Sequence, residues 1–319
     1  MITFLVRRLA LGLLVLWVIT VAVFVLFFVA PHNVARLIAG KLATPQTVAL
    51  VSQRLGLNRP VLDQYWSFLD RLGHGNLGYS FYSQEPVSTL LGSRIAVSVS
   101  LALGAAVIWV VIGVATGVLA ATRPRSLPDR TLTVLSLGFY SMPTFLLGII
   151  VLYLLFYRLH LAGVDLFPGS GYVPLTSDPL EWARHLILPW LSLALTAAAA
   201  YTRLTRASML DVLGEDFVRT AAAKGLTRNR VIYRHALRAA ITPVTTQFGI
   251  DVGVLLGGAV VTEQIFGLPG LGQIAVQSIL SQDLPVIIAI VTLASAFVVV
   301  ANIAVDILYA VLDPRVRLE

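Results

Sequence analysis

The residues best suited to chemistry lie in one charged segment, residues 215–238, which reads EDFVRTAAAKGLTRNRVIYRHALR. It holds six Lys or Arg residues in a chain that is 57% hydrophobic and only 12% charged. Glu215 and Asp216 suit the first turn of a helix and Gly225 suits its end, so FVRTAAAK predicts a helix of two turns. Because so short a helix is marginal alone in water, we expect it to pack against a partner, which its alanines would let approach closely.

A lipid surface is the alternative partner for these charges. Arg230, Arg234 and Arg238 recur every fourth residue, and a basic stripe of this kind pairs with anionic lipid head groups. Lipid binding would explain some of these arginines. It would not explain the alanine-rich short helix between Gly214 and Gly225. The sequence predicts a helical stalk, a short helix at its tip and a return stalk.

A second candidate group lies in the apolar run PVTTQFGIDVGVLLGGAVVT, which carries Asp251. Its glycines at 249, 253 and 257 form a stripe for close helix contact, and Asp251 points away from that stripe. An ionised aspartate facing lipid costs roughly 2.5–3.5 kcal/mol, which favours a hydrated or paired setting. The predicted polar face consists of Gln247, Asp251, Gly258 and Thr262. The alternative is a buried acid hydrogen-bonded to a neighbouring helix, and Asp306 is a weaker candidate.

Several other chemistries are excluded by what the sequence lacks. It has no G-x-x-x-x-G-K-[ST] phosphate loop, so ATP binding by that route is excluded. The five histidines form no H-x-x-x-H pair, and no cysteine is present for disulfides or thiolate metal sites. The basic segment has no interleaved aromatic platform for a nucleic acid. We therefore expect no catalytic, cofactor-binding or metal-binding residues and no nucleic-acid partner.

Helices that cross a membrane must position these groups. Uncharged apolar runs of roughly 18 residues or more mark such helices. Six runs qualify, two of them with one acid each: Leu9–Ala30, Ile95–Ala121, Thr131–Tyr157, Leu186–Thr202, Pro243–Thr262 and Pro285–Leu312. The first is too long for the apolar core of a signal peptide, so we expect it to be a permanent span. The predicted fold is an all-α polytopic membrane protein with six transmembrane helices.

The charges of the loops predict the orientation. Fifteen of the 23 Lys and Arg residues lie in the two ends and in loops 122–130 and 203–242, so that side is predicted to be cytoplasmic. The predicted organisation is an N-terminal tail and first span over 1–30, an extracytoplasmic loop over 31–94, a five-helix core over 95–312 and a cytoplasmic tail over 313–319. The core includes the cytoplasmic loop 203–242.

Two extracytoplasmic segments also have predicted structure. In the long loop, apolar residues recur at helical spacing over residues 61–72, which predicts an amphipathic helix before the glycine-rich turns at 73–78. It serves either as a structural cap or as a docking surface. Between the last two runs, EQIFGLPGLG contains too many Gly and Pro residues for a regular helix. It is either a partly re-entrant loop or a simple outer turn.

The chain resembles a known family of transport proteins. TAAAKG, followed by His235 in HALRAAITP, looks like the cytoplasmic EAA loop of bacterial ABC importer permeases. More specifically, the chain resembles the first permease of dipeptide, oligopeptide and nickel importers. Supporting stretches are LGLNRPVLDQYWSFL, GNLGYSF, SMPTFLLG, GEDFVRTAAAKGL, EQIFGLPGLG and DPRVR. The sequence departs from the family at Arg219, where the general pattern has glutamate, and in APHNVARL, where relatives have an acidic stretch.

This resemblance implies a mechanism of alternating access. The chain would form half of a heterodimer with a homologous second permease, served by two cytoplasmic ATPases that bind ATP and Mg and by an extracytoplasmic solute-binding lipoprotein. The short helix would couple to an ATPase through Arg219, Thr220, Ala221, Ala222, Ala223, Lys224, Gly225 and Leu226. The polar face of the fifth run would line the translocation path. The outer gate would include Glu263, Phe266 and Pro269.

The substrate remains open at this point. Short peptides are the first expectation, and nickel chelates, glutathione and oligosaccharides are alternatives that share this permease frame. A secondary transporter using Asp251 or Asp306 as a proton site is a further alternative, but the six runs show no inverted repeat. A purely structural scaffold would leave the docking tip and the acids unexplained.

Overall fold

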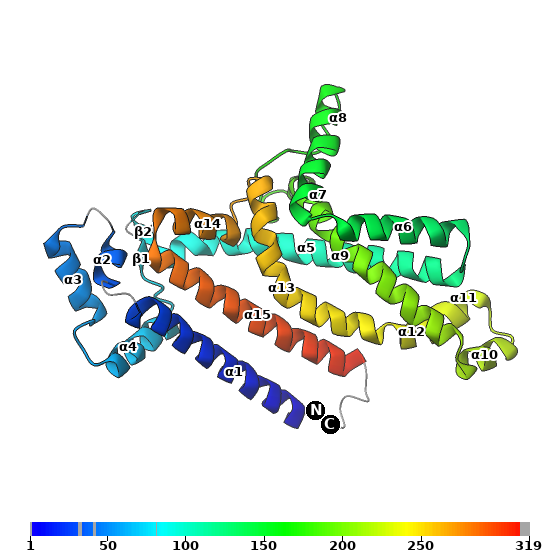
Figure 1. Cartoon of the computed structure of the whole chain (residues 1–319), viewed down its shortest axis with the longest axis horizontal. Helices are drawn as coiled ribbons and strands as arrows, with labels where there is room; N and C mark the ends of the chain where they lie inside the picture. The colour runs from blue at the N-terminus through cyan, green and yellow to red at the C-terminus, as the bar shows by residue number, and fades with distance from the viewer. Residues whose placement is uncertain (1, 31–33, 41–42, 81, 313–319) are drawn as a thin grey trace. The chain divides into compact units, whose positions relative to one another are not determined.

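The computed structural model describes residues 2–30, 34–40, 43–80 and 82–312 (Figure 1). Within its helices, the side chains at 2–5, 34, 37, 252–254, 256–258, 305, 306 and 308–312 lie outside the described set. The predicted tail 313–319, Asp306, Gly258 and two glycines of the predicted stripe, Gly253 and Gly257, therefore fall outside the described residues or side chains. Contacts divide the chain into two compact units, one of 1–98 with 269–304 and one containing 99–268.

The first unit is built from the N-terminal helices, a small hairpin and the last two helices. Its elements are α1 (Ile2–Phe24) with a π-helical end (Val25–Val29), α2 (Val34–Ala39), α3 (Pro45–Leu55), α4 (Val61–Gly73), β1 (Tyr79–Ser80), β2 (Glu85–Pro86), the start of α5 (Val87–Thr122), α14 (Leu271–Ser281) and most of α15 (Leu284–Leu312). β1 pairs antiparallel with β2, with Tyr79 opposite Pro86 and Ser80 opposite Glu85. The hairpin is an addition to the predicted all-α fold.

The helix predicted in the long loop is present as α4. Its apolar stripe packs on the end of the first span, where Phe24, Phe28, Tyr65 and Phe68 form one aromatic cluster. The predicted turns follow, with Gly75 and Gly78 in the left-handed region at φ +71° and +97°. The Ser80 hydroxyl then donates a hydrogen bond to the buried Asp283 carboxylate, which fixes the hairpin to the start of α15.

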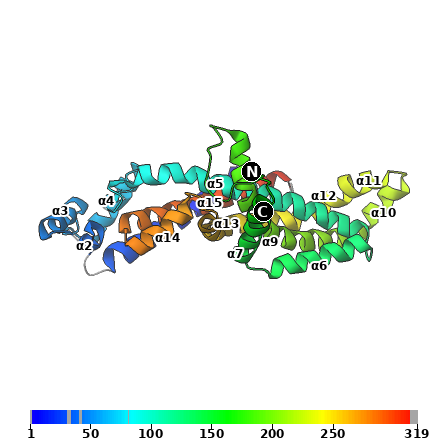
Figure 2. The same ribbon diagram turned by 90° about the horizontal axis from the view of Figure 1, so that it is seen from above.

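The second unit contains the segments in which the candidate site was predicted. Its elements are the rest of α5, α6 (Leu127–Ser141), α7 (Thr144–Val151) with a π-helical end (Leu152–Tyr157), α8 (Arg158–Leu161), α9 (Pro179–Leu213), α10 (Asp216–Ala223), α11 (Arg228–Arg230), a π-helical segment (Val231–Ala236), α12 (Leu237–Ala240) and α13 (Thr242–Ile265). α9 packs on α6, α7, α12 and α13. Figures 1 and 2 both show α6 running alongside α9, with α10 and α11 at one end of α9.

The prediction of a single helix over Thr131–Tyr157 was wrong. The helix breaks at Met142, which is extended at φ −87° and ψ 130°, and restarts after Pro143. Proline lacks a donor N–H and pushes the preceding residue out of the helical region. The apolar run is therefore divided between α6 and the rod of α7 and α8, which point in different directions in Figure 1.

Close contact between α5 and α9 depends on glycines of α5. A Cβ at Gly113 would lie 2.4 Å from the Tyr201 Cβ, and one at Gly117 would lie 2.5 Å from the Thr205 Cβ. Such contacts are tighter than real side chains allow, so these positions require glycine. Small residues bring helices together in membrane proteins, where lipid offers no hydrophobic drive for association. The sequence prediction placed its small-residue stripe on a different helix.

Five helices of the described residues are long and apolar enough to cross a membrane: Val6–Val29, Val87–Thr122, Thr144–Leu161, Pro179–Leu213 and Leu284–Ala304. They establish a mostly helical, polytopic architecture. The predicted fifth span falls on α13, where several side chains lie outside the described set, so the total of six remains a prediction. α9 extends the predicted fourth span in both directions and continues through Pro189, whose carbonyl accepts a bond from the Ser192 hydroxyl.

Candidate functional site

The two-turn helix predicted at residues 216–224 is present as α10. It begins after Glu215, which is extended, and ends at Lys224, followed by Gly225 at φ +78°. This left-handed conformation favours glycine because a Cβ there would crowd the next carbonyl oxygen. The chain then turns back into the rod of α11, the π-helical segment and α12. The segment thus consists of the end of α9, the short helix α10 and a returning helical rod.

The inner face of α10 differs from the prediction. Val218 and Ala221 are buried in a cluster of the chain's own residues, with Met209 from α9 and Val231 and Ala236 from the returning rod. Ala221 therefore anchors α10 to this chain and cannot form the narrow outer surface expected of it. That surface falls to Ala222 and Ala223, which are exposed, as are Arg219 and Thr220.

The exposed side of α10 contains one residue that the sequence prediction missed. Phe217 is 47% exposed on a helix whose neighbouring residues are polar or small. The sequence did contain a signal for this position. Phe217 directly precedes the buried Val218, so its side chain lies at the edge of the inner face of α10. Thr220, Lys224 and Gly225 are exposed and Leu226 is half-buried. Around the helix, Phe217 lies on the same side as Thr220 and Lys224, and Arg219 and Ala223 lie on another side.

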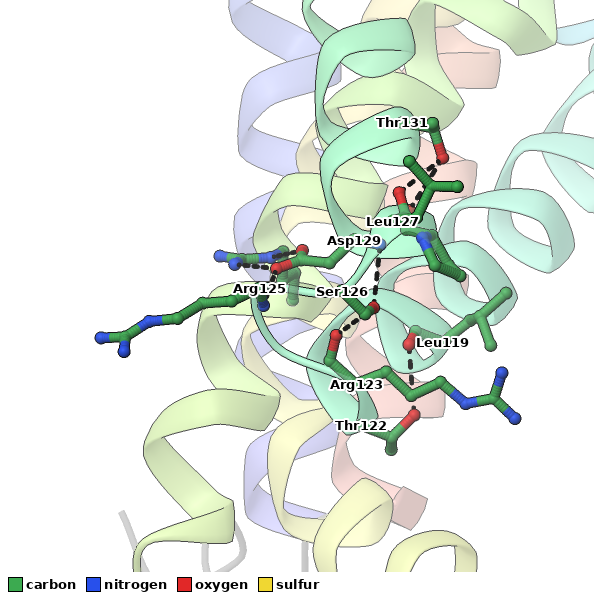
Figure 3. A network of polar contacts seen from close by, with 10 residues as sticks. Leu119, Thr122, Arg123, Arg125, Ser126, Leu127, Asp129 and Thr131 are labelled. Carbon is green, nitrogen blue, oxygen red and sulfur yellow. Dashed lines mark hydrogen bonds and ion pairs between the residues drawn. The ribbon is translucent and has the colours of Figure 1, made fainter.

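A buried ion pair ties the base of this stalk to the loop after α5. Arg206 of α9 makes two bonds to Asp129, Nε to Oδ1 at 2.6 Å and Nη2 to Oδ2 at 2.9 Å. The Arg125 backbone N–H adds a third bond to Oδ2, at 2.8 Å. Figure 3 shows Asp129 turned toward this loop, where Ser126 caps α6. Nearby, Arg228 at the start of the returning rod donates to the Thr122 carbonyl at 2.8 Å.

The Asp129 carboxylate is held in its charged form. The hydrogen bonds from Arg206 lower the pKa of Asp129 to about 2, against the opposing effect of burial. An unfolded aspartate titrates near 3.9. The pair therefore stabilises the folded chain above about pH 4, and this contribution is lost as the pH falls toward 2.

We expect Asp129→Asn to loosen the C-terminal end of α9. The variant leaves Arg206 without its carboxylate, and a hydrogen bond to a charged group is worth about 1.5–3 kcal/mol. Thermal unfolding of the purified protein at pH 7 should therefore shift downward. At pH 3 the difference in unfolding temperature between the variant and the unmodified chain should shrink, because the stabilisation that the charged Asp129 carboxylate provides is then being lost. An unchanged difference at both pH values would contradict this role.

A cavity of about 500 Å³, mostly apolar with a few polar side chains, lies among α5, α6, α7, α9 and α13. Gln247 and Asp251 both line it, and the Gln247 Nε2 donates to the Asp251 Oδ1 at 2.9 Å. Leu255 continues the same face one turn further along α13. The structure thus brings two of the four residues of the predicted polar face together at one cavity.

Residues that the sequence prediction missed supply much of the opposite wall. Trp109, Tyr140 and Thr196 line the cavity, and the Thr196 hydroxyl is buried without a hydrogen-bond partner in the described residues. The Tyr201 hydroxyl lies within electrostatic reach of Asp251 but makes no hydrogen bond of normal geometry. These groups offer unused donors and acceptors beside a carboxylate.

An exposed arginine that does not itself line the cavity contacts one of the lining residues, Tyr140. The Arg203 guanidinium lies 5.5 Å from the centre of the Tyr140 ring. Arg203 is seven residues from Thr196 on α9, which places the two on the same side of the helix. The cavity therefore has an acid in its lining, and a guanidinium lies over the ring of Tyr140, which also lines it. This arrangement suits a solute that carries both charges.

The remaining predicted site residues lie elsewhere. Thr262 is 2% exposed and does not line the cavity, and Glu263 and Phe266 are each 1% exposed. Two of the three residues predicted for the outer gate are therefore buried, and their role in a gate stays a prediction. The non-helical segment predicted here is present between α13 and α14. It is closed by a bond from the Leu268 N–H to the Glu263 carbonyl at 2.9 Å, and Pro269 is exposed.

Comparison with known families matches almost the whole chain. Residues 113–318 match the family described as the binding-protein-dependent transport system inner membrane component. Residues 1–102 match the N-terminal family of the same transport systems. The first match includes α10, the ion pair at Asp129 and every residue that lines the cavity except Trp109.

Individual relatives agree with this assignment. A protein of Sinorhizobium fredii named a probable peptide ABC transporter permease is 37% identical over 98% of this chain and 99% of its own length. The glutathione transport system permease of Escherichia coli K12 is 38% identical over 99% of each chain. Among solved structures, the MetNI methionine ABC transporter in an inward-facing form matches with a TM-score of 0.53 and 19% identity. The match covers 70% of this chain and 96% of that one, and supports the fold.

The match over residues 113–318 covers both the short anchored helix α10 and the residues of α13 that line the cavity. The named relatives are transport permeases, which supports a transport role for this chain. The chain belongs to the binding-protein-dependent transport system inner membrane component family, and it is a permease subunit of an ABC importer of the peptide type.

Proposed function

We propose that this chain forms half of the translocation path for short peptides in a bacterial inner membrane. The observation that carries the proposal is the cavity of about 500 Å³ where Asp251 and Gln247 face Tyr140 and Thr196. An acid in an apolar helix is costly unless water or a partner meets it. A solute path supplies both water and a binding partner for the acid. Two relatives are named as peptide and glutathione transport proteins.

The chain would work as one part of a larger assembly. A homologous second permease would complete the path, an extracytoplasmic binding lipoprotein would deliver the solute, and two cytoplasmic ATPases would supply energy. Both termini and α10 would lie on the cytoplasmic side, as the excess of basic residues in those segments predicts. ATP and Mg would be bound by the ATPases, with α10 receiving their movement through its exposed face. Six spans would carry this chain through the membrane.

The charges of the cavity favour a zwitterionic solute over the alternatives. Asp251 could receive an amino group, and Arg203 beside Tyr140 could receive a carboxylate. A dipeptide and glutathione both carry these groups. An oligosaccharide carries neither, and a nickel chelate has no fixed need for a carboxylate on the protein. Because the chain belongs to an ABC importer family, the alternative that it is a secondary transporter is no longer needed.

Reconstitution of the complete importer tests this proposal. The complex is purified through a tag on this chain and placed in proteoliposomes with ATP inside and the binding protein outside. We expect ATP-dependent accumulation of a labelled dipeptide or of glutathione, with no uptake when the ATPases are omitted. Accumulation of a nickel chelate or an oligosaccharide in preference to both peptides would overturn the peptide assignment. Failure of any ATPase to copurify would overturn the assembly.

A further inference from the structure

A second cavity, separate from the proposed path, lies within the first unit. It has a volume of about 180 Å³ and lies where α3 and α4 meet the ends of two apolar spans. Its floor is apolar and includes Phe28, Phe68 and Ile288, of which the last two are buried. No acidic residue lines it. The cavity would therefore accept a hydrocarbon group.

Two arginines from different helices line the same cavity. Arg54 belongs to the last turn of α3 and Arg71 to the last turn of α4. Neither guanidinium makes a hydrogen bond or ion pair with the described part of the chain. Arg71 is half-buried, and burial lowers the pKa of Arg71 while the neighbouring Asp70 acts in the opposite direction. A partly desolvated guanidinium without a partner is costly, so an anionic group from another molecule would stabilise it.

The place of the cavity restricts that molecule to one that lies in the membrane. Phe28 lies at the end of the span Val6–Val29, and Pro285 and Ile288 lie in the first turns of the span Leu284–Ala304. The apolar floor is therefore level with the edge of the hydrocarbon layer, while the arginines belong to helices of the adjoining loop. Trp66 of α4 is 65% exposed, as is common for tryptophan at the membrane interface. A ligand here needs an apolar end on the bilayer side and an anionic end on the loop side.

We propose that this cavity binds an anionic phospholipid of the adjoining leaflet, with part of one acyl chain on the floor and the phosphate between Arg54 and Arg71. Guanidinium groups bind phosphate oxygens through paired hydrogen bonds, and basic pockets at helix ends bind lipid head groups in this way. The bound lipid would connect α3 and α4 to α15. It would hold the loop helices in place against the last span.

Lipid retention measured by native mass spectrometry tests the proposal. The complete importer is purified from membranes, depleted of lipid in detergent, and titrated with phosphatidylglycerol or with phosphatidylcholine. We expect one phosphatidylglycerol per complex to bind at least tenfold more tightly than phosphatidylcholine. Arg54→Gln with Arg71→Gln should abolish that preference. Lysine at both positions should retain most of it, because the charges remain.

Matched variants distinguish a lipid from a simple anion and from loss of structure. Arg59→Gln removes a charge from the same loop without touching the cavity, and it should bind as the unmodified complex does. Val51→Phe fills the floor with both arginines intact, and it should weaken phosphatidylglycerol binding about as much as the double Gln variant. Equal retention in the double Gln and Arg59→Gln complexes would overturn the proposal. So would displacement of phosphatidylglycerol by inorganic phosphate together with unchanged phosphatidylglycerol binding in the Val51→Phe complex, because that would indicate an anion site alone.

Discussion

Replacing Asp251 by Asn is expected to reduce dipeptide uptake by about tenfold or more while the importer still assembles. The variant keeps the shape of the side chain and can keep the contact with Gln247, whose Nε2 lies 2.9 Å from the Asp251 Oδ1. It removes the negative charge that would meet a peptide's amino group. Since a charge-assisted hydrogen bond is worth about 1.5–3 kcal/mol, its loss accounts for a change of this size. Initial uptake rates in proteoliposomes provide the measurement.

The choice of substrate separates a path residue from a packing residue. An N-acetylated dipeptide has no amino charge, so its slower uptake should change little between the unmodified complex and the Asp251→Asn complex. Arg203→Gln should produce the complementary result, affecting dipeptides more than their C-terminal amides. Asp211→Asn is the matched control, because Asp211 is exposed on α9 away from the cavity. Normal dipeptide uptake by the Asp251→Asn complex, with a cysteine at 251 inert to small hydrophilic reagents, would assign this acid to packing.

The sequence was most informative where chemistry repeats along a single element. Apolar runs located the long helices, glycine at 225 located the end of α10, and the stripe over residues 61–72 located α4. Gln247 and Asp251 were found because four residues return a side chain to the same face of a helix. Each of these signals is local, so no knowledge of the tertiary structure was needed to read them.

The parts that the sequence did not predict depend on contacts between distant segments. Asp129 and Arg206 are 77 residues apart, and nothing in either neighbourhood indicates that they meet. The direction in which Ala221 points depends on where α10 rests against α9 and the returning rod. Hydropathy also could not show that Pro143 divides one apolar run, because the residues on both sides of it are equally apolar. The burial of Glu263 depends on packing in the same way.

The outer face of α10 leads to the second large effect. Val218 and Ala221 fix the helix to the chain, so an ATPase that moves α10 also moves the core cluster behind it. Phe217 is 47% exposed at the edge of this anchored helix, and buried aromatic residues dominate the energy of many interfaces. We therefore expect Phe217→Ala to reduce transport-linked ATP hydrolysis about tenfold. The substitution removes little from the chain's own packing, so its thermal stability in isolation should change by less than about 1 kcal/mol.

An aromatic residue on the neighbouring rod provides the matched control. Tyr233 is 60% exposed and lies outside α10, so Tyr233→Ala should leave stimulated hydrolysis close to that of the unmodified importer. Ala221→Arg should act differently from Phe217→Ala. It forces a charge into the cluster of Met209 and Val231, so it should displace α10 and lower both stability and ATPase copurification. Membrane insertion should survive in all three variants, because none of these residues lies in a predicted span. If Phe217→Ala and Tyr233→Ala reduced hydrolysis equally, the coupling surface would have to extend beyond α10 along the returning rod.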